Sequence, residues 1–133
     1  MPGAAHTRTR AEMTIKKILI VDDSPTERHV LNSLLTKAGY EVVSCDNGDD
    51  AIVKAKLTMP DLILMDVVMP GLNGFQATRA ISRDPDTRSI PIILCTSKSQ
   101  ETDKIWGMRQ GARDYIVKPV NRDELLEKIA AIG

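Results

Sequence analysis

Residues 16–23 read Lys-Lys-Ile-Leu-Ile-Val-Asp-Asp, a short apolar run that ends in two adjacent carboxylates. Three later segments repeat the pattern of an apolar, β-branched run followed by a polar side chain, namely residues 61–66, 90–96 and 114–119. Runs of this composition are typical of strands that are buried on both faces, as in a parallel sheet. The sequence therefore predicts an α/β fold built on a parallel sheet.

The polar residues that end these runs are expected to meet at one place. In an open parallel α/β sheet, the functional crevice lies outside the carboxyl ends of the strands. The four segments bring five polar residues to that edge: Asp22, Asp23, Asp66, Thr96 and Lys118. This convergence is the strongest functional signal in the chain.

Three carboxylates in one crevice need positive charge nearby. Unit charges about 4 Å apart repel by about 4 kcal/mol at an effective dielectric constant near 20, so the carboxylates must be partly protonated or neutralised by cations. Lys118 supplies one positive charge. Carboxylates with open water positions also suit Mg²⁺, which prefers oxygen ligands and a phosphate partner. We therefore expect a magnesium site among the aspartates.

Length and charge exclude several classes of protein. The chain has 133 residues, of which 42% are hydrophobic, and this fits one globular domain. Lys and Arg number 18 and Asp and Glu number 18, so no basic surface is expected for nucleic-acid binding. The chain has no apolar run of about 20 residues to span a membrane and no secretory signal. A soluble, cytoplasmic protein is expected.

From Ile15 onward the chain alternates between expected strands and helices. Residues 1–13 show no periodicity and are expected to form a loose N-terminal extension, with Met13 as the functional start, ahead of one domain at 14–133. The expected strands are about 17–22, 40–45, 61–66, 90–95 and 114–117. The expected helices are one from Ser24-Pro25 to a stop at Gly39 and others at about 49–57, 75–83, 100–110 and 122–131. Five such repeats with right-handed crossovers make a doubly wound sheet with helices on both faces.

These residues carry a resemblance to a known family. The chain from Ile15 to Gly133 resembles the CheY-like receiver domain of bacterial two-component response regulators. The matching motifs are Asp22-Asp23, Asp66-x-x-Met69-Pro70-x-x-Asn73-Gly74, Thr96 and Tyr115-x-x-Lys118-Pro119. The resemblance implies the flavodoxin-like strand order 2-1-3-4-5. Within the family, residues 71–78 and 100–115 are similar to stand-alone receivers of the chemosensory pathway that controls type IV pili and twitching motility.

The resemblance also implies roles for the polar cluster. Asp66 is the expected phosphoacceptor, taking the phosphoryl group from a kinase phosphohistidine. Asp23 is expected to bind Mg²⁺ directly and Asp22 mostly through water, with Asp66 and the backbone carbonyl of Val68 completing the protein ligands. Lys118 is expected to pair first with Asp66 and then with the phosphoryl oxygens.

Two further residues are expected to form a switch. Thr96 would bond a phosphoryl oxygen after transfer, and Tyr115 would move inward with it. From the residues alone, an ordinary strand-end threonine and a half-buried strand tyrosine remain open alternatives. The resemblance further implies a cis peptide bond between Lys118 and Pro119.

The chain is expected to act through protein contacts and not as an enzyme, although it assists its own phosphorylation and dephosphorylation. The expected partners are a chemotaxis-type sensor histidine kinase and a downstream protein. The latter would bind the face around Lys104, Met108 and Tyr115, made by the fourth helix, fifth strand and fifth helix. Gly107 lies inside that fourth helix, where glycine costs about 1 kcal/mol relative to alanine, so Gly107→Ala is expected to stiffen a weak helix. We expect a monomer that binds no nucleic acid and does not insert into membranes.

The resemblance also gives an expectation for the lifetime of the phosphoryl group. Val68 and Lys98 lie two residues beyond Asp66 and Thr96, and in this family such residues flank the path of the hydrolytic water. Because Val68 has no polar group to orient a water, self-dephosphorylation is not expected to be among the fastest.

Other functions remain open at this point. One alternative is a phosphate sink for a sister receiver, and another is a receiver cut from a larger regulator, although residues 130–133 show no linker. An aspartyl-nucleophile phosphohydrolase also uses aspartates, a lysine, a threonine and Mg²⁺. Those enzymes place a second aspartate two residues after the nucleophile, however, whereas Asp22 and Asp23 are adjacent. A nucleotide-binding module is disfavoured because neither a P-loop nor G-x-G-x-x-G follows the first strand.

Overall fold

The computed structural model describes residues 14–97 and 101–133, without the side chains of residues 101 and 102. The expected extension at 1–13 and the expected role of Lys98 lie outside this part of the chain. The strands are β1 (Lys17–Val21), β2 (Glu41–Cys45), β3 (Leu62–Asp66), β4 (Ile92–Thr96) and β5 (Asp114–Val117). The helices are α1 (Pro25–Lys37), α2 (Gly48–Thr58), α3 (Gly74–Arg83), α4 (Glu101–Arg109) and α5 (Arg122–Ile132).

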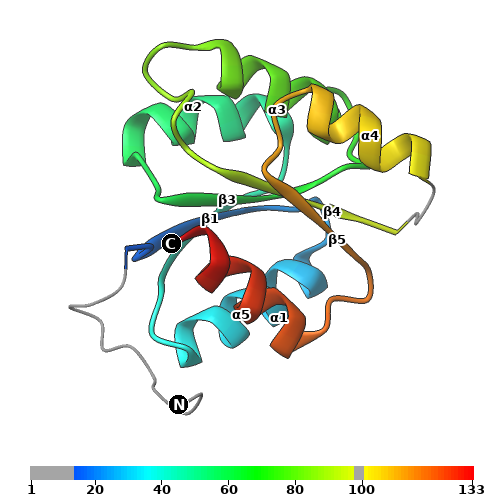
Figure 1. Cartoon of the computed structure of the whole chain (residues 1–133). Coiled ribbons are helices and arrows are strands. Elements are labelled where there is room, and N and C mark those ends of the chain that lie inside the picture. The colour runs from blue at the N-terminus through cyan, green and yellow to red at the C-terminus, as the bar shows by residue number, and fades with distance from the viewer. Residues whose placement is uncertain (1–13, 98–100) are drawn as a thin grey trace.

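The strands form one parallel sheet in the order β2-β1-β3-β4-β5. This confirms the predicted doubly wound fold and its strand order. Helices α1 and α5 cover one face of the sheet, and α2, α3 and α4 cover the other (Figure 1). Among the described residues, no helix is both long and apolar enough to cross a membrane.

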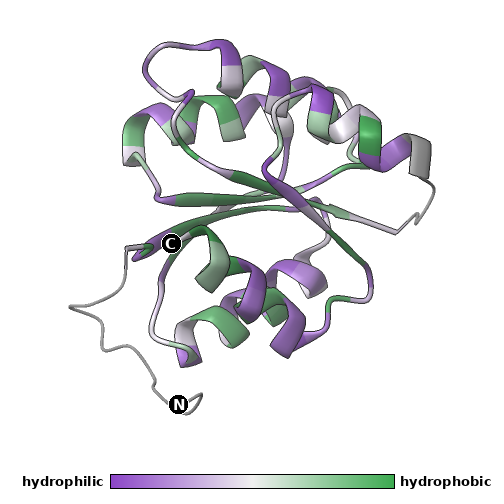
Figure 2. Cartoon of the chain, in the orientation of Figure 1, coloured by the Kyte–Doolittle hydropathy of each residue, from purple (hydrophilic) through white to green (hydrophobic). Residues whose placement is uncertain are grey.

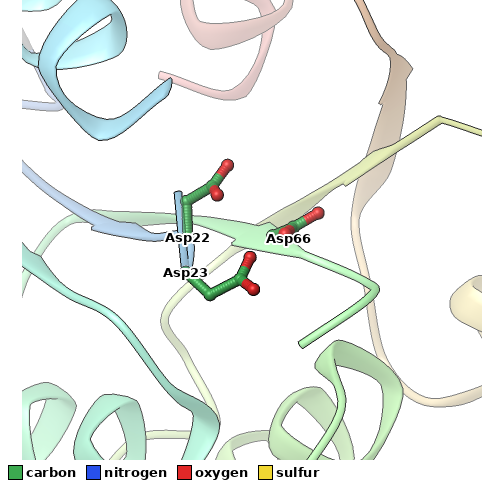
Figure 3. Close-up of side chains that lie close together, drawn as sticks. All are labelled: Asp22, Asp23 and Asp66. Atoms are coloured by element: carbon green, nitrogen blue, oxygen red, sulfur yellow. The ribbon is translucent and has the colours of Figure 1, made fainter. Parts of the chain in front are cut away.

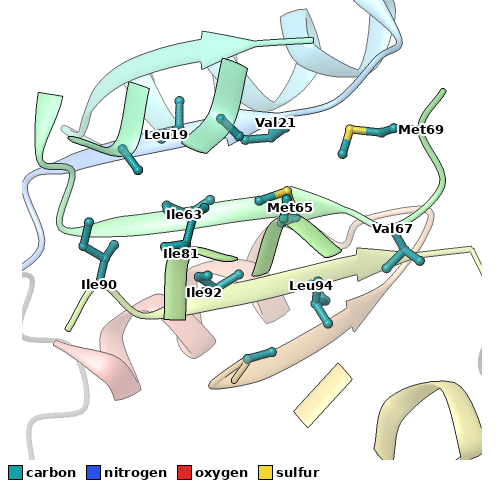
Figure 4. Close-up of a cluster of buried hydrophobic side chains, with 14 residues drawn as sticks. Leu19, Val21, Ile63, Met65, Val67, Met69, Ile81, Ile90, Ile92 and Leu94 are labelled. Atoms are coloured by element: carbon teal, nitrogen blue, oxygen red, sulfur yellow. The ribbon is translucent and has the colours of Figure 1, made fainter. Parts of the chain in front are cut away.

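Each inner strand supplies apolar side chains to both faces of the sheet. Leu19, Val21, Ile63 and Met65 pack beneath α2 and α3 in one buried cluster (Figure 4). The alternating residues point the other way and pack against α1 and α5: Ile18, Ile20, Leu62, Leu64, Ile93 and Ile116. The strands are accordingly green along most of their length in a colouring by hydropathy, while the helices carry purple, hydrophilic faces (Figure 2). Because both faces are covered, the strands read as continuous apolar runs in the sequence.

Local sequence signals fix both ends of α1. Ser24 caps α1 by accepting the backbone N–H of Glu27, and Pro25 follows it at the first helical position. Gly39 ends the same helix with φ of 100°, a left-handed conformation that glycine adopts without strain. These three residues behave as the sequence predicts.

Three strands begin later than predicted: the second by one residue, at Glu41, and the third and fourth for identifiable reasons. The third strand starts at Leu62 because the carboxylate of Asp61 accepts the backbone N–H groups of Lys16 and Lys17 at 2.9 Å each. The fourth strand starts at Ile92, directly after Pro91, which has no N–H to donate. That strand also extends to Thr96, so this threonine ends the strand and does not follow it.

Gly107 has a packing role that helix propensity alone does not describe, and its effect on the stiffness of α4 stays a prediction. It is buried on the side of α4 that faces β4, and a methyl group at this position would overlap Leu94 Cδ1 and crowd Phe75 Cε1 at 3.3 Å. The absence of a side chain therefore lets α4 lie close to the sheet. Alanine would have to displace buried Leu94 before it could stiffen the helix.

Candidate functional site

The predicted polar residues meet at the carboxyl edge of the sheet. Asp22 and Asp23 follow β1, and Asp66 ends the neighbouring strand β3. Their side chains lie together at the strand ends (Figure 3), and each offers a carboxylate oxygen within 4.8 Å of the other two. Thr96 ends β4 and Lys118 follows β5. The sheet thus places all five residues at one edge.

Asp22 is held firmly from two sides. The residue is only 1% exposed. Its Oδ1 accepts the Ser24 N–H at 2.9 Å, and its Oδ2 accepts from Lys118 Nζ at 3.1 Å. Arg28 also donates to the Asp22 backbone carbonyl at 2.7 Å. Asp23, in contrast, is exposed to solvent. Of the two adjacent aspartates, Asp23 is therefore the one better placed to take a ligand directly.

Lys118 is the central cation of the site. Its ammonium donates to Asp66 Oδ1 at 3.0 Å, to Asp22 Oδ2 at 3.1 Å and to Glu27 Oε2 at 2.9 Å. Its backbone N–H donates to the Thr96 carbonyl at 2.7 Å, and the Lys118–Pro119 bond is cis, as the resemblance implies. Burial alone would lower the pKa of Lys118, but the three carboxylates outweigh burial and raise it. The ammonium therefore stays charged.

Asp66 has an unusual electrostatic environment. Its burial raises its pKa to about 6, and the negative charges of Asp22 and Asp23 add to the effect, while the hydrogen bond from Lys118 opposes it. One lysine is thus not enough to neutralise the cluster. The site has capacity for further positive charge.

The loop after Asp66 is fixed by a close approach of α3. The Gly74 N–H donates to the Val67 carbonyl at 2.9 Å, and a Cβ atom at Gly74 would overlap the Asp66 carbonyl oxygen. Glycine at this position lets the helix begin directly against the end of β3. Val68 lies in the same loop with 64% of its surface exposed. Whether its carbonyl binds a metal stays a prediction.

The two expected switch residues lie on neighbouring strands. Thr96 is 7% exposed and lines a surface pocket with Val68 and Asp103. Tyr115 is half-buried, beside Leu94 in the pairing of β4 and β5. The Lys104 ammonium lies 4.6 Å from the centre of its ring. The geometry accommodates a switch, and the roles of both residues stay predictions.

Glu27 is a member of the site that the sequence analysis did not single out. It lies in the first turn of α1, three residues after Ser24, a spacing that usually signals a capping box. In that motif the glutamate would accept the Ser24 N–H, but here Asp22 takes that N–H and Glu27 accepts from Lys118. The only sequence signal for Glu27 therefore pointed to a different, purely local role.

The donors present fit Mg²⁺. The cluster offers three carboxylates from Asp22, Asp23 and Asp66, which are hard oxygen ligands. Exposed Asp23 leaves room for the waters that Mg²⁺ retains, and the raised pKa of Asp66 indicates that another cation would be favourable there.

The sequence is similar to those of several curated proteins. Protein PilH of Pseudomonas aeruginosa is 55% identical over 116 residues, which cover 87% of this chain and 96% of PilH. Several other curated relatives are longer, and the chain spans 26% to 52% of their length.

Solved structures show the same fold. The chemotaxis protein CheY4 of Vibrio cholerae superposes with a TM-score of 0.85 at 32% identity, covering 90% of this chain and all of CheY4. The receiver domain of the sensor histidine kinase PA1611 from Pseudomonas aeruginosa has a TM-score of 0.80 at 34% identity, covering 87% of this chain and 95% of that domain. A magnesium ion is coordinated in its active-site cleft.

The family comparison covers nearly all of the part of the chain described by the structure. The response regulator receiver domain matches residues 18–130, from the first strand into the last helix. Together with the parallel sheet, its strand order and the acidic cluster at its carboxyl edge, this match leaves one assignment: the chain belongs to the response regulator receiver domain family.

Proposed function

We propose that this protein is a response regulator that accepts a phosphoryl group on Asp66 from a phosphohistidine of a sensor kinase. The observation that carries the proposal is the position of Asp66, a nearly buried carboxylate at the end of β3, beside Lys118 and the two other aspartates. Acceptance of a phosphoryl group is general in this family, and Asp66 ends β3, the middle strand of the sheet.

The chemistry requires little from the protein beyond positioning and charge balance. A carboxylate oxygen of Asp66 forms a bond to phosphorus, the bond from phosphorus to the imidazole nitrogen breaks, and that nitrogen keeps the electron pair. Lys118 lies 3.0 Å from Asp66 Oδ1 and is placed to balance the negative charge of the arriving phosphoryl oxygens. The protein is in this sense a phosphoacceptor that assists its own reaction.

We further propose that Asp22, Asp23, Asp66 and the backbone carbonyl of Val68 hold Mg²⁺. When bound, Mg²⁺ neutralises charge on the phosphoryl oxygens and on the carboxylates. Exposed Asp23 would bind directly, whereas Asp22, whose two oxygens already have partners, would act mainly through water. The magnesium-containing receiver domain of PA1611 supports this assignment by similarity.

The output is proposed to be a change in protein contacts. Thr96 would bond a phosphoryl oxygen and Tyr115 would move with it, altering the face formed by α4, β5 and α5. This face carries a shallow pocket lined by Lys104, Met108 and Tyr115, among others. Its apolar lining is half-exposed, with Ile105 at 47% and Met108 at 45%. Such a patch is suited to bind a downstream protein.

One experiment tests the phosphoacceptor assignment. The protein is incubated with phosphoramidate or acetyl phosphate and Mg²⁺, and the intact mass is measured. We expect the mass of one phosphoryl group on the wild type and none on Asp66→Asn or in the presence of a chelator. Undiminished labelling of Asp66→Asn would show that the nucleophile is another residue.

The biological setting is proposed from the similarity to PilH. We place the protein in the cytoplasm as a monomer that receives phosphoryl groups from a chemotaxis-type kinase of a pathway controlling type IV pili and twitching motility. It would either carry the signal or drain phosphoryl groups from a sister receiver. A phosphotransfer time course with candidate kinases distinguishes these roles, because a sink shortens the lifetime of the phosphorylated sister receiver when both are present.

A further inference from the structure

Glu27 takes the closest position to the ammonium of Lys118. The distances from Nζ are 2.9 Å to Glu27, 3.0 Å to Asp66 and 3.1 Å to Asp22. A lysine ammonium has three N–H donors, and these three carboxylates are enough to engage all of them. A phosphoryl oxygen can therefore gain a direct hydrogen bond from Lys118 only if one carboxylate gives up its own.

The three carboxylates differ in how easily they can leave. The side chain of Asp22 is 2% exposed and also holds the Ser24 N–H, and the side chain of Asp66 is 8% exposed and bears the proposed phosphorylation site. The side chain of Glu27 is 45% exposed. It has the longest chain of the three and can turn into water, where its charge is solvated. Asp66 is expected to give its own donor to one phosphoryl oxygen, and Glu27 is the further partner that can move into water and free a second donor for another phosphoryl oxygen.

Among residues 14–97 and 103–133, Lys118 is the only hydrogen-bond partner of the Glu27 carboxylate, and it comes from a distant segment. Its backbone N–H donates to Ser24 Oγ at 3.2 Å, which fixes the helix start and not the carboxylate. A glutamate at this position usually accepts the backbone N–H of the cap residue, but here Asp22 accepts the Ser24 N–H instead. The carboxylate of Glu27 is thus directed to the lysine by the fold of the site.

We propose that Glu27 is a placeholder for the phosphoryl group: its carboxylate occupies a donor of Lys118 in the unphosphorylated protein and is displaced into solvent when a phosphoryl oxygen takes that donor. Glu27 is a positioning residue that acts through Lys118. It opposes binding of the phosphoryl group and so limits how readily the protein is phosphorylated. This inference rests on the proposed phosphorylation of Asp66.

The test measures binding of beryllofluoride, a phosphoryl mimic, to the full chain by calorimetry with saturating Mg²⁺. We expect Glu27→Gln to bind beryllofluoride roughly two- to fivefold more tightly than the wild type, the range for release of a partly exposed ion pair. The matched control is Glu124→Gln. Glu124 has the same place in α5, three residues after the cap Asn121, and its backbone N–H is capped in the same way. Its removal should leave the affinity unchanged.

A second variant separates contact from long-range charge. Glu27→Asp keeps the charge but withdraws the carboxylate by one methylene group, so it should bind beryllofluoride nearly as tightly as Glu27→Gln. If Glu27→Asp behaves as the wild type while Glu27→Gln binds more tightly, the residue acts only through its field and the placeholder role is wrong. Unchanged or weaker binding by Glu27→Gln also overturns the proposal.

Titration with Mg²⁺ alone gives an independent readout. A placeholder on Lys118 predicts that Glu27→Gln binds Mg²⁺ no more weakly than the wild type, whereas loss of Mg²⁺ affinity would make Glu27 a metal ligand and overturn the proposal. Failure of the underlying function looks different. If the wild type does not bind beryllofluoride, or Asp66→Asn binds it equally well, the assignment of Asp66 fails. If the wild type binds beryllofluoride and Asp66→Asn does not, but the Glu27 variants bind it as the wild type does, only the placeholder role fails.

Discussion

Lys118 Nζ lies 3.0 Å from Asp66 Oδ1, although the two residues are 52 positions apart in the sequence. The same ammonium also binds Asp22 and Glu27, so Asp66 has only a share of its charge. The pKa of Asp66 is raised to about 6, because burial and the neighbouring aspartates outweigh the lysine. Binding of a further cation at this site is therefore electrostatically favourable.

The raised pKa of Asp66 makes a prediction about stability without metal. Between about pH 4 and pH 6 the folded state holds more protons than the unfolded state, so the free energy of unfolding falls as the pH rises through this range. Asp66→Asn has no carboxyl group at this position, so its free energy of unfolding does not fall with pH for this reason. We expect the variant to be more stable than the wild type by about 2–3 kcal/mol at pH 7 in a chelator, with the difference vanishing near pH 4. Urea unfolding at several pH values measures it, and a difference independent of pH would contradict the explanation.

Asp23→Asn should weaken Mg²⁺ binding more than Asp22→Asn. Asp23 is exposed and available as a direct ligand, whereas both oxygens of Asp22 already accept hydrogen bonds. Loss of an outer-shell group costs roughly 10–100-fold in metal affinity, so Asp22→Asn should fall in that range and Asp23→Asn should exceed it. Calorimetric titration of both variants decides the order. The reverse order would mean that the two roles are exchanged.

Val68→Asn should shorten the lifetime of the phosphorylated protein. Val68 is 64% exposed in the loop after Asp66 and offers no polar group, while an asparagine amide could orient a water for attack. We expect the decay rate to rise roughly several-fold through better positioning. Val53→Asn is a matched control, since Val53 is a valine of similar exposure on α2. Equal decay in the wild type and Val68→Asn would remove this position from the mechanism.

Gly107→Ala should destabilise the protein despite the better helix propensity of alanine. The added methyl group would overlap Leu94 Cδ1 in the core. Overpacking costs about 1–3 kcal/mol against a gain of about 1 kcal/mol, so we expect a net loss of up to about 2 kcal/mol. Leu94→Val should relieve the overlap, making the double variant more stable than the sum of the single changes predicts. If the changes in the free energy of unfolding of the two single variants simply add in the double variant, the contact with Leu94 is not the cause of the destabilisation.

Thr78→Val should stabilise the fold by about 1 kcal/mol. Thr78 is fully buried in α3, and among the described residues its hydroxyl has no hydrogen-bond partner. Valine has nearly the same shape without that cost. Thr87→Val is the matched control, because the equally buried Thr87 hydroxyl donates to the Ile81 carbonyl at 2.8 Å. It should lose stability, and loss of stability in both variants would show that Thr78 has a partner.

Much of the architecture could be read from short segments. The apolar runs before Asp22, Asp66 and Thr96 predicted buried parallel strands, and their common carboxyl edge predicted that the polar residues meet. Ser24-Pro25 and Gly39 marked the ends of α1 correctly, because capping and left-handed turns depend on side chains within a few residues.

The remaining features depended on contacts between distant segments. Helix propensity described Gly107 as a weak point, but its packing against Leu94 is set by the distance between α4 and the sheet. Likewise, the spacing of Ser24 and Glu27 is typical of a local capping box, which does not form here. The Ser24 N–H is taken by nearby Asp22, and the Glu27 carboxylate accepts from Lys118, which the sheet brings from 91 residues away. The sequence by itself determined the elements and the edge where they end, because periodicity and capping are local. Only the tertiary structure decided which carboxylates share Lys118, because ion pairing depends on distances that the folded sheet sets.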